Sequence, residues 1–170
     1  ASRVTKGTSM TNVLVELFRH NTWANERLLG VCAELDDSVL AATGDGVYGS
    51  VRDTLVHIFG AQGRYVHRLG GEPPRPMVSE REPFPGFETL RESVRASSRA
   101  FEALAARADT IETLRGEYGG KPYELEPEVL FTQAINHATE HRAHINTILT
   151  QAGVEPPQLD SWAWNDLGRP

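Results

Sequence analysis

Apolar side chains recur at intervals of three and four residues in four separate stretches of the chain. This spacing places them on one face of a helix. The first stretch covers residues 11–34, and the second runs from Ser50 to the glycine pair at 70–71. The third covers residues 87–108, and the fourth begins at Glu126 and runs to residue 151 or 152. The pattern therefore predicts four long amphipathic helices.

Residue types at the ends of these stretches agree with the prediction. Ser50 and Asp53 have the spacing of a capping box, in which each side chain bonds the backbone amide of the other residue. Glu126 and Pro127 suit the first turn of a helix, since proline lacks the amide hydrogen that would go unpaired there. Gly153 suits the left-handed conformation that often follows a last turn.

The connections between the predicted helices differ in character. Residues 72–86 contain five prolines, too many for a regular element, and predict a long crossover loop. Residues 111–118 and 122–125 flank a glycine pair and predict a short β-hairpin. The aromatic tail at 161–164 is expected to pack back on the helices. Together these elements predict an all-α fold, a four-helix bundle with a long crossover loop and a short β-hairpin.

Length and composition fit this fold. A chain of 170 residues with 39% hydrophobic and 24% charged residues is typical of one globular domain. We assign that domain to residues 10–170. Residues 1–9 are small and polar and lack an initiator methionine, so they are expected to be an expression remnant, with Met10 as the natural start.

Charge and hydropathy exclude two classes of partner. A net charge of −6 and the scatter of the basic residues argue against nucleic-acid binding. No apolar run approaches the ~18–20 residues of a membrane span, and no signal-peptide pattern occurs, so we expect a cytoplasmic protein that does not bind membranes. The single cysteine, Cys32, excludes an internal disulfide and a cysteine-based zinc site, and is expected to be a structural thiol.

The chemistry-bearing residues of the chain are histidines. His137 and His141 are four residues apart in the last predicted helix, which stacks them on one face with Cβ atoms roughly 5–6 Å apart. Two imidazoles at this spacing can bind one cation, and His57, in the middle of the second predicted helix, is a candidate third ligand. Such a pattern predicts an open three-histidine metal site inside the bundle. A set of satisfied interior histidines is the alternative.

The other histidines and the nearby acid leave alternatives open. His144 could be a fourth ligand, although an asparagine or water could serve equally, and His20 and His67 are expected to be exposed. Glu140 is a candidate general base or an exposed helix residue. The sequence from His137 to His141 matches the inverted zincin motif H-x-x-E-H, but only 29 residues follow it, too few for the larger fold of such proteases.

Two catalytic patterns are absent from the sequence. No glutamate stands three residues before a histidine, which excludes the di-iron carboxylate arrangement of helical bundles. The sequence also has no G-x-S-x-G elbow, P-loop or dinucleotide fingerprint. The histidines therefore remain the candidate site.

Three segments resemble the DinB/YfiT-like family of metal-dependent proteins. They are Trp23-Ala-Asn-Glu-Arg-Leu-Leu29, Thr54-Leu-Val-His-Ile58 and Asn136-His-Ala-Thr-Glu-His-Arg-Ala-His-Ile145. They are similar to the family's W-A-N-x-R-L-L, L-x-H-I and N-H-x-x-x-H-R-G-Q-I. The residues at 143 and 144 depart from the last of these patterns, since alanine and histidine replace the usual glycine and glutamine.

The resemblance implies an up-down-down-up four-helix bundle, a divalent metal site at His57, His137 and His141, and a homodimer. Family members with known activity include thiol-S-transferases that use low-molecular-weight thiols and a mycothiol-dependent isomerase. On the resemblance we expect a metal-dependent transferase, in which a metal-activated thiolate attacks an electrophilic small molecule.

Other functions stay open. One alternative is a metal-dependent hydrolase of a small ester or amide, because the same ligands can activate water. Another is a non-catalytic metal-binding, stress-related bundle, and a third is a dimerising bundle without metal. The metal is expected to be zinc, nickel or iron, since imidazole suits all three and affinity alone does not choose among them.

Overall fold

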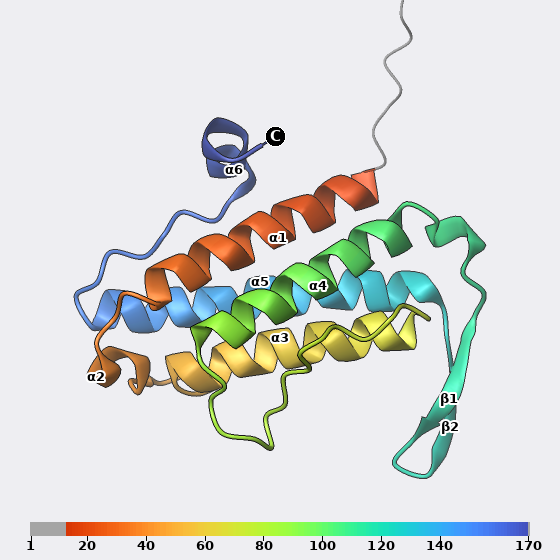
Figure 1. Ribbon diagram of the computed structural model, residues 1–170, viewed down its shortest axis with the longest axis horizontal. Helices are drawn as coiled ribbons and strands as arrows, with labels where there is room; N and C mark the ends of the chain where they lie inside the picture. Colours follow the sequence, from red (N-terminus) through yellow and green to blue (C-terminus); the bar gives the residue numbers. More distant parts are fainter. Residues whose placement is uncertain (1–12, 170) are drawn as a thin grey trace, which may run out of the picture.

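The computed structural model describes residues 13–169, so the expected expression remnant at 1–9, Met10 and the first two residues of the first predicted helix lie outside the described part. The described chain is mostly helical, with one small antiparallel sheet (Figure 1). Its elements are α1 (Val13–Cys32), α2 (Asp37–Leu40), α3 (Val51–Arg68), α4 (Phe87–Ala105), a 3-10 turn (Ala108–Thr110), β1 (Leu114–Tyr118), β2 (Lys121–Leu125), α5 (Pro127–Gln151) and α6 (Ser161–Leu167).

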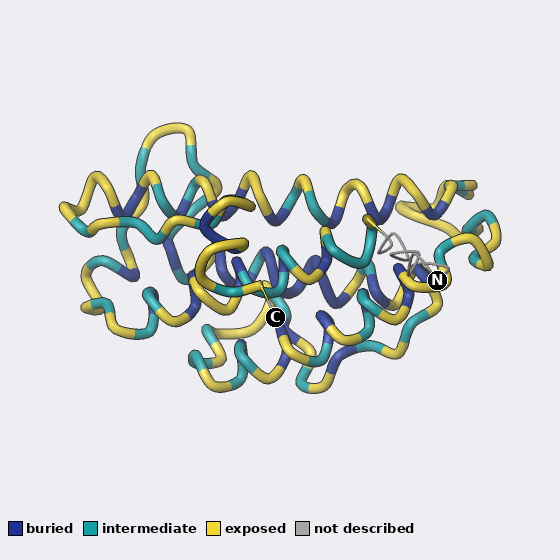
Figure 2. Tube along the Cα trace, turned by 90° about the horizontal axis from the view of Figure 1, so that it is seen from above, coloured by how far each residue is buried: buried dark blue, intermediate teal, exposed yellow. Residues whose placement is uncertain are grey.

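The four long helices α1, α3, α4 and α5 run side by side and form the body of the molecule (Figure 1). Helix α1 contacts α4 and α5, and α3 contacts the same two helices from the other side. Each helix turns its buried residues inward and its exposed residues outward, as the amphipathic pattern predicts (Figure 2). None of the helices within residues 13–169 has the length and apolar character needed to cross a membrane.

The predicted signals at the helix ends are present in the structure. The hydroxyl of Ser50 accepts a hydrogen bond from the amide of Asp53 at 3.1 Å, and the Ser50 amide donates to the Asp53 carboxylate at 3.3 Å. Pro127 is the first residue of α5. Gly153 has a φ of 75°, the left-handed conformation expected after the last turn. These contacts satisfy backbone groups that a helix end otherwise leaves unpaired.

The β-hairpin prediction is also confirmed. Strands β1 and β2 pair in an antiparallel register that sets Leu114 opposite Leu125 and Tyr118 opposite Lys121. Gly119 and Gly120 form the turn, and both have positive φ, which only glycine adopts without strain.

Several elements differ in detail from the sequence-based prediction. Helix α4 ends at Ala105, not at residue 108, because the chain tightens into the 3-10 turn over the next residues. The segment between α1 and α3, predicted as a loop, contains the one-turn helix α2. The aromatic tail packs back as expected, and it does so as the helix α6, whose N-terminus is capped by the carboxylate of Asp160.

The crossover loop between α3 and α4 lies directly against the α3 backbone. A β-carbon added at Gly60 would come within 3.1 Å of the Val78 carbonyl oxygen, and one at Gly63 within 3.0 Å of the Pro74 ring. Glycine at these helical positions therefore lets the loop approach closely. Val78 itself is only 4% exposed, so the loop is anchored next to α3 just before Glu80.

A polar layer divides the hydrophobic core into two clusters. Each long helix carries buried polar side chains between its apolar ones, namely Asn21 and Asn25 on α1, Gln62 on α3, Ser97 on α4 and Arg142 on α5. One cluster contains Leu28, Leu55 and Ile145, and the other contains Phe18, Val66 and Phe101.

Hydrogen bonds connect the members of this layer in a chain across all four helices. Nη1 of Arg142 donates to the amide oxygens of Asn21 at 2.6 Å and Asn25 at 2.8 Å. Asn25 donates to Gln62 at 3.1 Å, and Gln62 donates to Ser97 at 2.8 Å. Because buried polar groups are costly unless paired, the network fixes how α3 and α5 face each other. These two helices carry the candidate metal ligands.

Candidate metal centre

The three candidate ligands lie together in the structure. His57 comes from the middle of α3, and His137 and His141 come from successive turns of α5. One ring nitrogen from each lies within 4.8 Å of the others, a spacing that could hold a metal ion. The ring centroids are 4.5–4.8 Å apart. The packing of α3 on α5 thus brings together residues 80 positions apart in the sequence.

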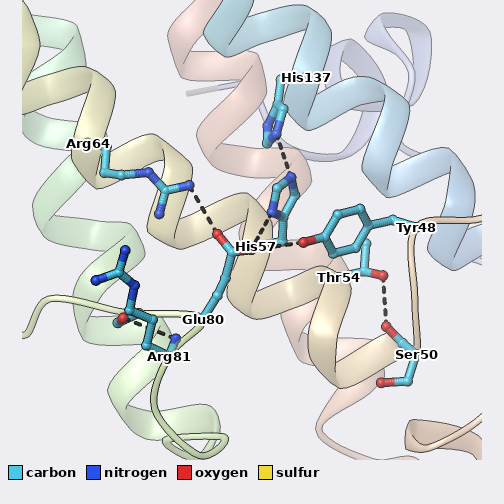
Figure 3. Close-up of polar contacts among 9 residues, drawn as sticks. Tyr48, Ser50, Thr54, His57, Arg64, Glu80, Arg81 and His137 are labelled. Atoms are coloured by element: carbon cyan, nitrogen blue, oxygen red, sulfur yellow. Dashed lines mark hydrogen bonds and ion pairs between the residues drawn. The ribbon is translucent and has the colours of Figure 1, made fainter. Parts of the chain in front are cut away.

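A carboxylate from the crossover loop orients the ring of His57. The Nδ1 atom of His57 lies 2.9 Å from Oε2 of Glu80 (Figure 3). A carboxylate accepts hydrogen bonds only, so Nδ1 carries the proton and Nε2 presents its lone pair to the other histidines. That Nε2 atom lies 2.9 Å from Nε2 of His137. Metal-binding histidines usually have such an acceptor on the second nitrogen.

Two further side chains hold the Glu80 carboxylate in place. The hydroxyl of Tyr48 donates to Oε2 at 2.8 Å, and the guanidinium of Arg64 donates to Oε1 at 3.1 Å (Figure 3). Burial alone would raise the pKa of Glu80, but the hydrogen bonds from His57 and Tyr48 outweigh it and lower that pKa to about 2. Glu80 is therefore ionised throughout the neutral pH range.

Tyr48 also packs against the histidines. Its ring stacks on His57 at a centroid distance of 4.0 Å and meets His141 edge-on at 5.1 Å. Burial, and to a lesser degree the hydrogen bond to Glu80, raises the pKa of the Tyr48 hydroxyl. The hydroxyl therefore stays protonated and can donate. Tyr48 thus restricts two of the three rings to the orientation seen here.

The surroundings of His137 and His141 favour the neutral form of both rings. Burial lowers the pKa of His137 to about 4, helped by repulsion from the rings of His141 and His57. Burial likewise lowers the pKa of His141, and His57 and His144 add to the effect. A neutral imidazole is the form that binds a metal, so both rings are ready to act as ligands at pH 7.

The donor set fits a divalent cation of the zinc, nickel or iron type. All three candidate donors are imidazole nitrogens, which these ions accept. His141 is only 8% exposed, and its Nδ1 atom is buried without a hydrogen-bond partner among the described residues. A buried imidazole nitrogen left unpaired is costly, and a cation bound at that atom would remove the cost.

The other sequence-based candidates do not belong to this cluster. His144 packs edge-on against His141 with centroids 5.2 Å apart, but it does not belong to the three-residue group. Glu140 is exposed on α5. His67 is exposed as expected.

The expectation of an exposed His20 is wrong. Its ring is half-buried, and its Nε2 atom donates to the carbonyl oxygen of Leu159 at 2.9 Å. The tail that precedes α6 folds over α1 and covers the ring. Cys32 is fully buried, and burial raises the pKa of its thiol to about 12, which suits a structural residue and not a nucleophile.

Sequence reasoning missed Glu80 and Tyr48. Both lie in segments without helical periodicity, one in the proline-rich loop and one just before α3. The one available signal is Gly60 and Gly63, whose missing side chains allow another segment to approach α3. That signal marks the helix face beside the loop, but it does not say which loop residue reaches His57.

Comparison with known proteins gives a consistent result. The model of a family described as the DinB family matches residues 9–167. Among solved structures, a DinB-like protein from Bacillus cereus superposes with a TM-score of 0.64 at 19% identity, over 85% of this chain and 94% of that one. At this identity the likeness shows the fold alone. No curated protein matches the chain.

Proposed function

Because the chain belongs to the DinB family, we propose that it binds a divalent metal ion through His57, His137 and His141 and acts as a metal-dependent enzyme. The observation that carries this proposal is the convergence of three imidazole nitrogens within 4.8 Å, one of them on a buried ring with an unpaired Nδ1. Glu80 supports it, since its carboxylate orients the His57 ring toward the other two.

The number of ligands favours a catalytic site over a structural one. Structural zinc sites usually have four protein ligands, whereas catalytic sites have three and keep a position open. Within residues 13–169, the group that could hold an ion contains three side chains, and His144 stands outside it. The arrangement therefore supports a reaction at the metal more than a brace between helices.

We infer that the reaction is a thiol transfer, in which a low-molecular-weight thiol attacks an electrophilic small molecule. When bound, the cation would supply the Lewis acidity that lowers the pKa of a coordinated thiol or water. The protein's own residues hold the ligand rings neutral and oriented, through burial of His137 and the hydrogen bond from His57 to Glu80. The choice of thiol over water rests on the family resemblance.

The experiment that tests this function measures thiol consumption by the zinc-loaded and the chelated protein. Cysteine or glutathione is mixed with bromobimane, which becomes fluorescent when a thiol displaces its bromide. The zinc-loaded protein is expected to accelerate the reaction, and both the chelated protein and the His57→Ala variant to lose the acceleration. His67→Ala changes an exposed histidine of the same helix and serves as the matched control.

The same proteins distinguish the alternatives. Zinc-dependent hydrolysis of 4-nitrophenyl acetate without thiol transfer would assign the site to a hydrolase. Zinc binding with neither reaction would leave a non-catalytic metal-binding protein. Nickel and iron replace zinc in parallel samples, because the imidazole ligands accept all three ions.

Family membership further supports the up-down-down-up order of a four-helix bundle and a homodimer. The bundle order and the homodimer are proposals, whereas the mostly helical fold is observed. The mass of the protein in solution tests the dimer.

A further inference from the structure

A hollow of about 750 Å³ lies beside the histidine cluster, between α3, the crossover loop and the tip of β1. Two of the residues that line it contact candidate ligands. Glu80 lines it and bonds His57, and Tyr65 lines it with its ring 5.9 Å from the ring of His137. A volume of this size lies within the ~300–1,000 Å³ of small-molecule sites.

The walls of this hollow carry more positive than negative charge. Arg64, Arg68 and Arg81 line it, with Glu80 as the one acid. Figure 3 shows Arg64 and Arg81 with Glu80, whose carboxylate is already bonded by Arg64, His57 and Tyr48. Within residues 13–169, neither Arg68 nor Arg81 forms an ion pair with a carboxylate.

The charge of these two guanidinium groups is therefore not neutralised by a carboxylate in the described chain, although the net charge of the protein is −6. The guanidinium of Arg68 lies over the ring of Tyr118, 5.8 Å from its centroid, which holds it at the hairpin edge of the hollow. An arginine fork binds planar oxyanions through two parallel hydrogen bonds. The hollow therefore presents donors suited to a carboxylate or a phosphate.

The remaining wall is apolar. Met77 and Val78 line the hollow together with the rings of Tyr65 and Tyr118. A ligand that extends across this surface would lay an apolar body on Met77 and the tyrosine rings.

We propose that this arginine-lined hollow is the substrate subsite for an oxyanion, and that the substrate is a small molecule with an anionic head and an apolar body. The proposal rests on the proposed function, because it is the nearness of the hollow to the candidate metal site that makes its ligand a substrate. Arg68 and Arg81 bind the head, and Met77 and Tyr65 contact the body.

The test is the binding of model ligands, measured by calorimetry on the full chain. 3-Phenylpropionate supplies a carboxylate and an apolar body, phenyl phosphate supplies a phosphate, and 3-phenylpropionamide is the uncharged control. We expect both anions to bind and the amide to bind at least about tenfold more weakly, since charge-assisted bonds are roughly twice as strong as neutral ones. The order of the two anions identifies the head group.

Substitutions locate the binding in the hollow. Arg68→Gln and Arg81→Gln are each expected to weaken anion binding by about tenfold. Arg27→Gln is the matched control, because Arg27 is also exposed and lies over an aromatic ring, that of Trp23 at 5.6 Å, on a different helix. It is expected to leave the affinity unchanged. Thermal unfolding checks that each variant is folded.

Three results would overturn the proposal: no anion binding to the wild-type protein, equal binding of the amide, or equal weakening by Arg27→Gln. The amide comparison uses the wild-type protein, so it holds even if an arginine variant does not fold. Metal content of the same samples tests the proposed function separately. Anion binding without metal would overturn the metal site and leave the hollow as an anion site without a substrate role, and metal binding without anion binding would overturn the subsite alone.

Discussion

At the scale of single residues, Glu80 determines how His57 presents its ring. The carboxylate accepts the Nδ1 hydrogen of His57 at 2.9 Å, which leaves Nε2 free to face His137. Tyr48 and Arg64 hold the carboxylate from two sides. An ion bound here would depend on this support, although Glu80 is not a member of the three-histidine group.

Removing that support should weaken metal binding without unfolding the protein. We expect Glu80→Ala to reduce zinc affinity about 10–100-fold, because the His57 ring loses the partner that fixes its tautomer. Competition with a chromogenic chelator measures the change. Glu82→Ala removes another exposed acid of the same loop and should leave the affinity as it is. Equal affinities for all three proteins would show that Glu80 does not orient the ligand.

Some residues of the site could be predicted from the sequence, and others could not. The spacing of His137 and His141 predicts their shared face because helical geometry is local. His57 could be added because it lies mid-helix on the flank of an apolar stripe. Glu80, Tyr48 and the partner of His20 could not be predicted, since each contact depends on how a loop or tail folds over a helix.

At the scale of elements, the polar layer joins α3 to α5 and so sets the distance between His57 and the other two histidines. The chain of bonds from Arg142 through Asn25 and Gln62 to Ser97 crosses four helices. Arg142 is 4% exposed and forms no ion pair with an acid among residues 13–169, and burial lowers the pKa of its guanidinium to about 10. It remains charged at neutral pH, and its acceptors are the two asparagine oxygens and the hydroxyl of Thr139.

Asn25→Ala should therefore destabilise the fold. The change removes an acceptor from Arg142 and a donor from Gln62, and each buried group left unpaired costs about 1–3 kcal/mol. We expect the free energy of unfolding to fall by about 2–5 kcal/mol in urea denaturation. Glu26→Ala, at the exposed neighbouring position, should cost less than about 1 kcal/mol. A loss that small for Asn25→Ala would mean that the layer does not hold the helices together.

The tail before α6 is attached to α1 through His20, and this contact should be sensitive to pH. Burial lowers the pKa of His20 further than its bond to the Leu159 carbonyl raises it. The neutral ring then contributes stability that is complete above the unfolded-state pKa of about 6.5 and is lost as the pH falls toward the lower folded-state pKa.

Replacing His20 with glutamine keeps a donor for Leu159 but removes the titration. In the presence of a chelator, the Tm of the wild-type protein should fall more between pH 8 and pH 5 than that of His20→Gln. His67→Gln changes an exposed histidine and should keep the wild-type dependence. Identical curves for all three proteins would exclude His20 as the pH-sensitive contact.

The elements themselves were largely predictable. The four long helices and the hairpin follow from periodicity and from turn residues, which act over a few positions. The end of α4 at Ala105 and the helix α2 were missed, because the last and first turns of helices depend on how neighbouring segments pack.

At the scale of the whole molecule, the proposed homodimer can be tested by mass in solution. Several large apolar side chains are exposed on the described surface, among them Leu17 at 43%, Leu167 at 62% and Trp162 at 82%. Light scattering should give twice the chain mass of 18.8 kDa. A mass of one chain across the micromolar concentration range would contradict the dimer.

The central claim is that His57, His137 and His141 bind one divalent ion, and metal content measures it most directly. Elemental analysis of untagged protein, equilibrated with zinc and then desalted, should give about one ion per chain for the wild type and for His67→Ala. The His57→Ala variant should retain less than about 0.2 ions per chain, because two imidazoles alone hold a metal weakly. Loading of His57→Ala equal to that of the wild type would contradict the account.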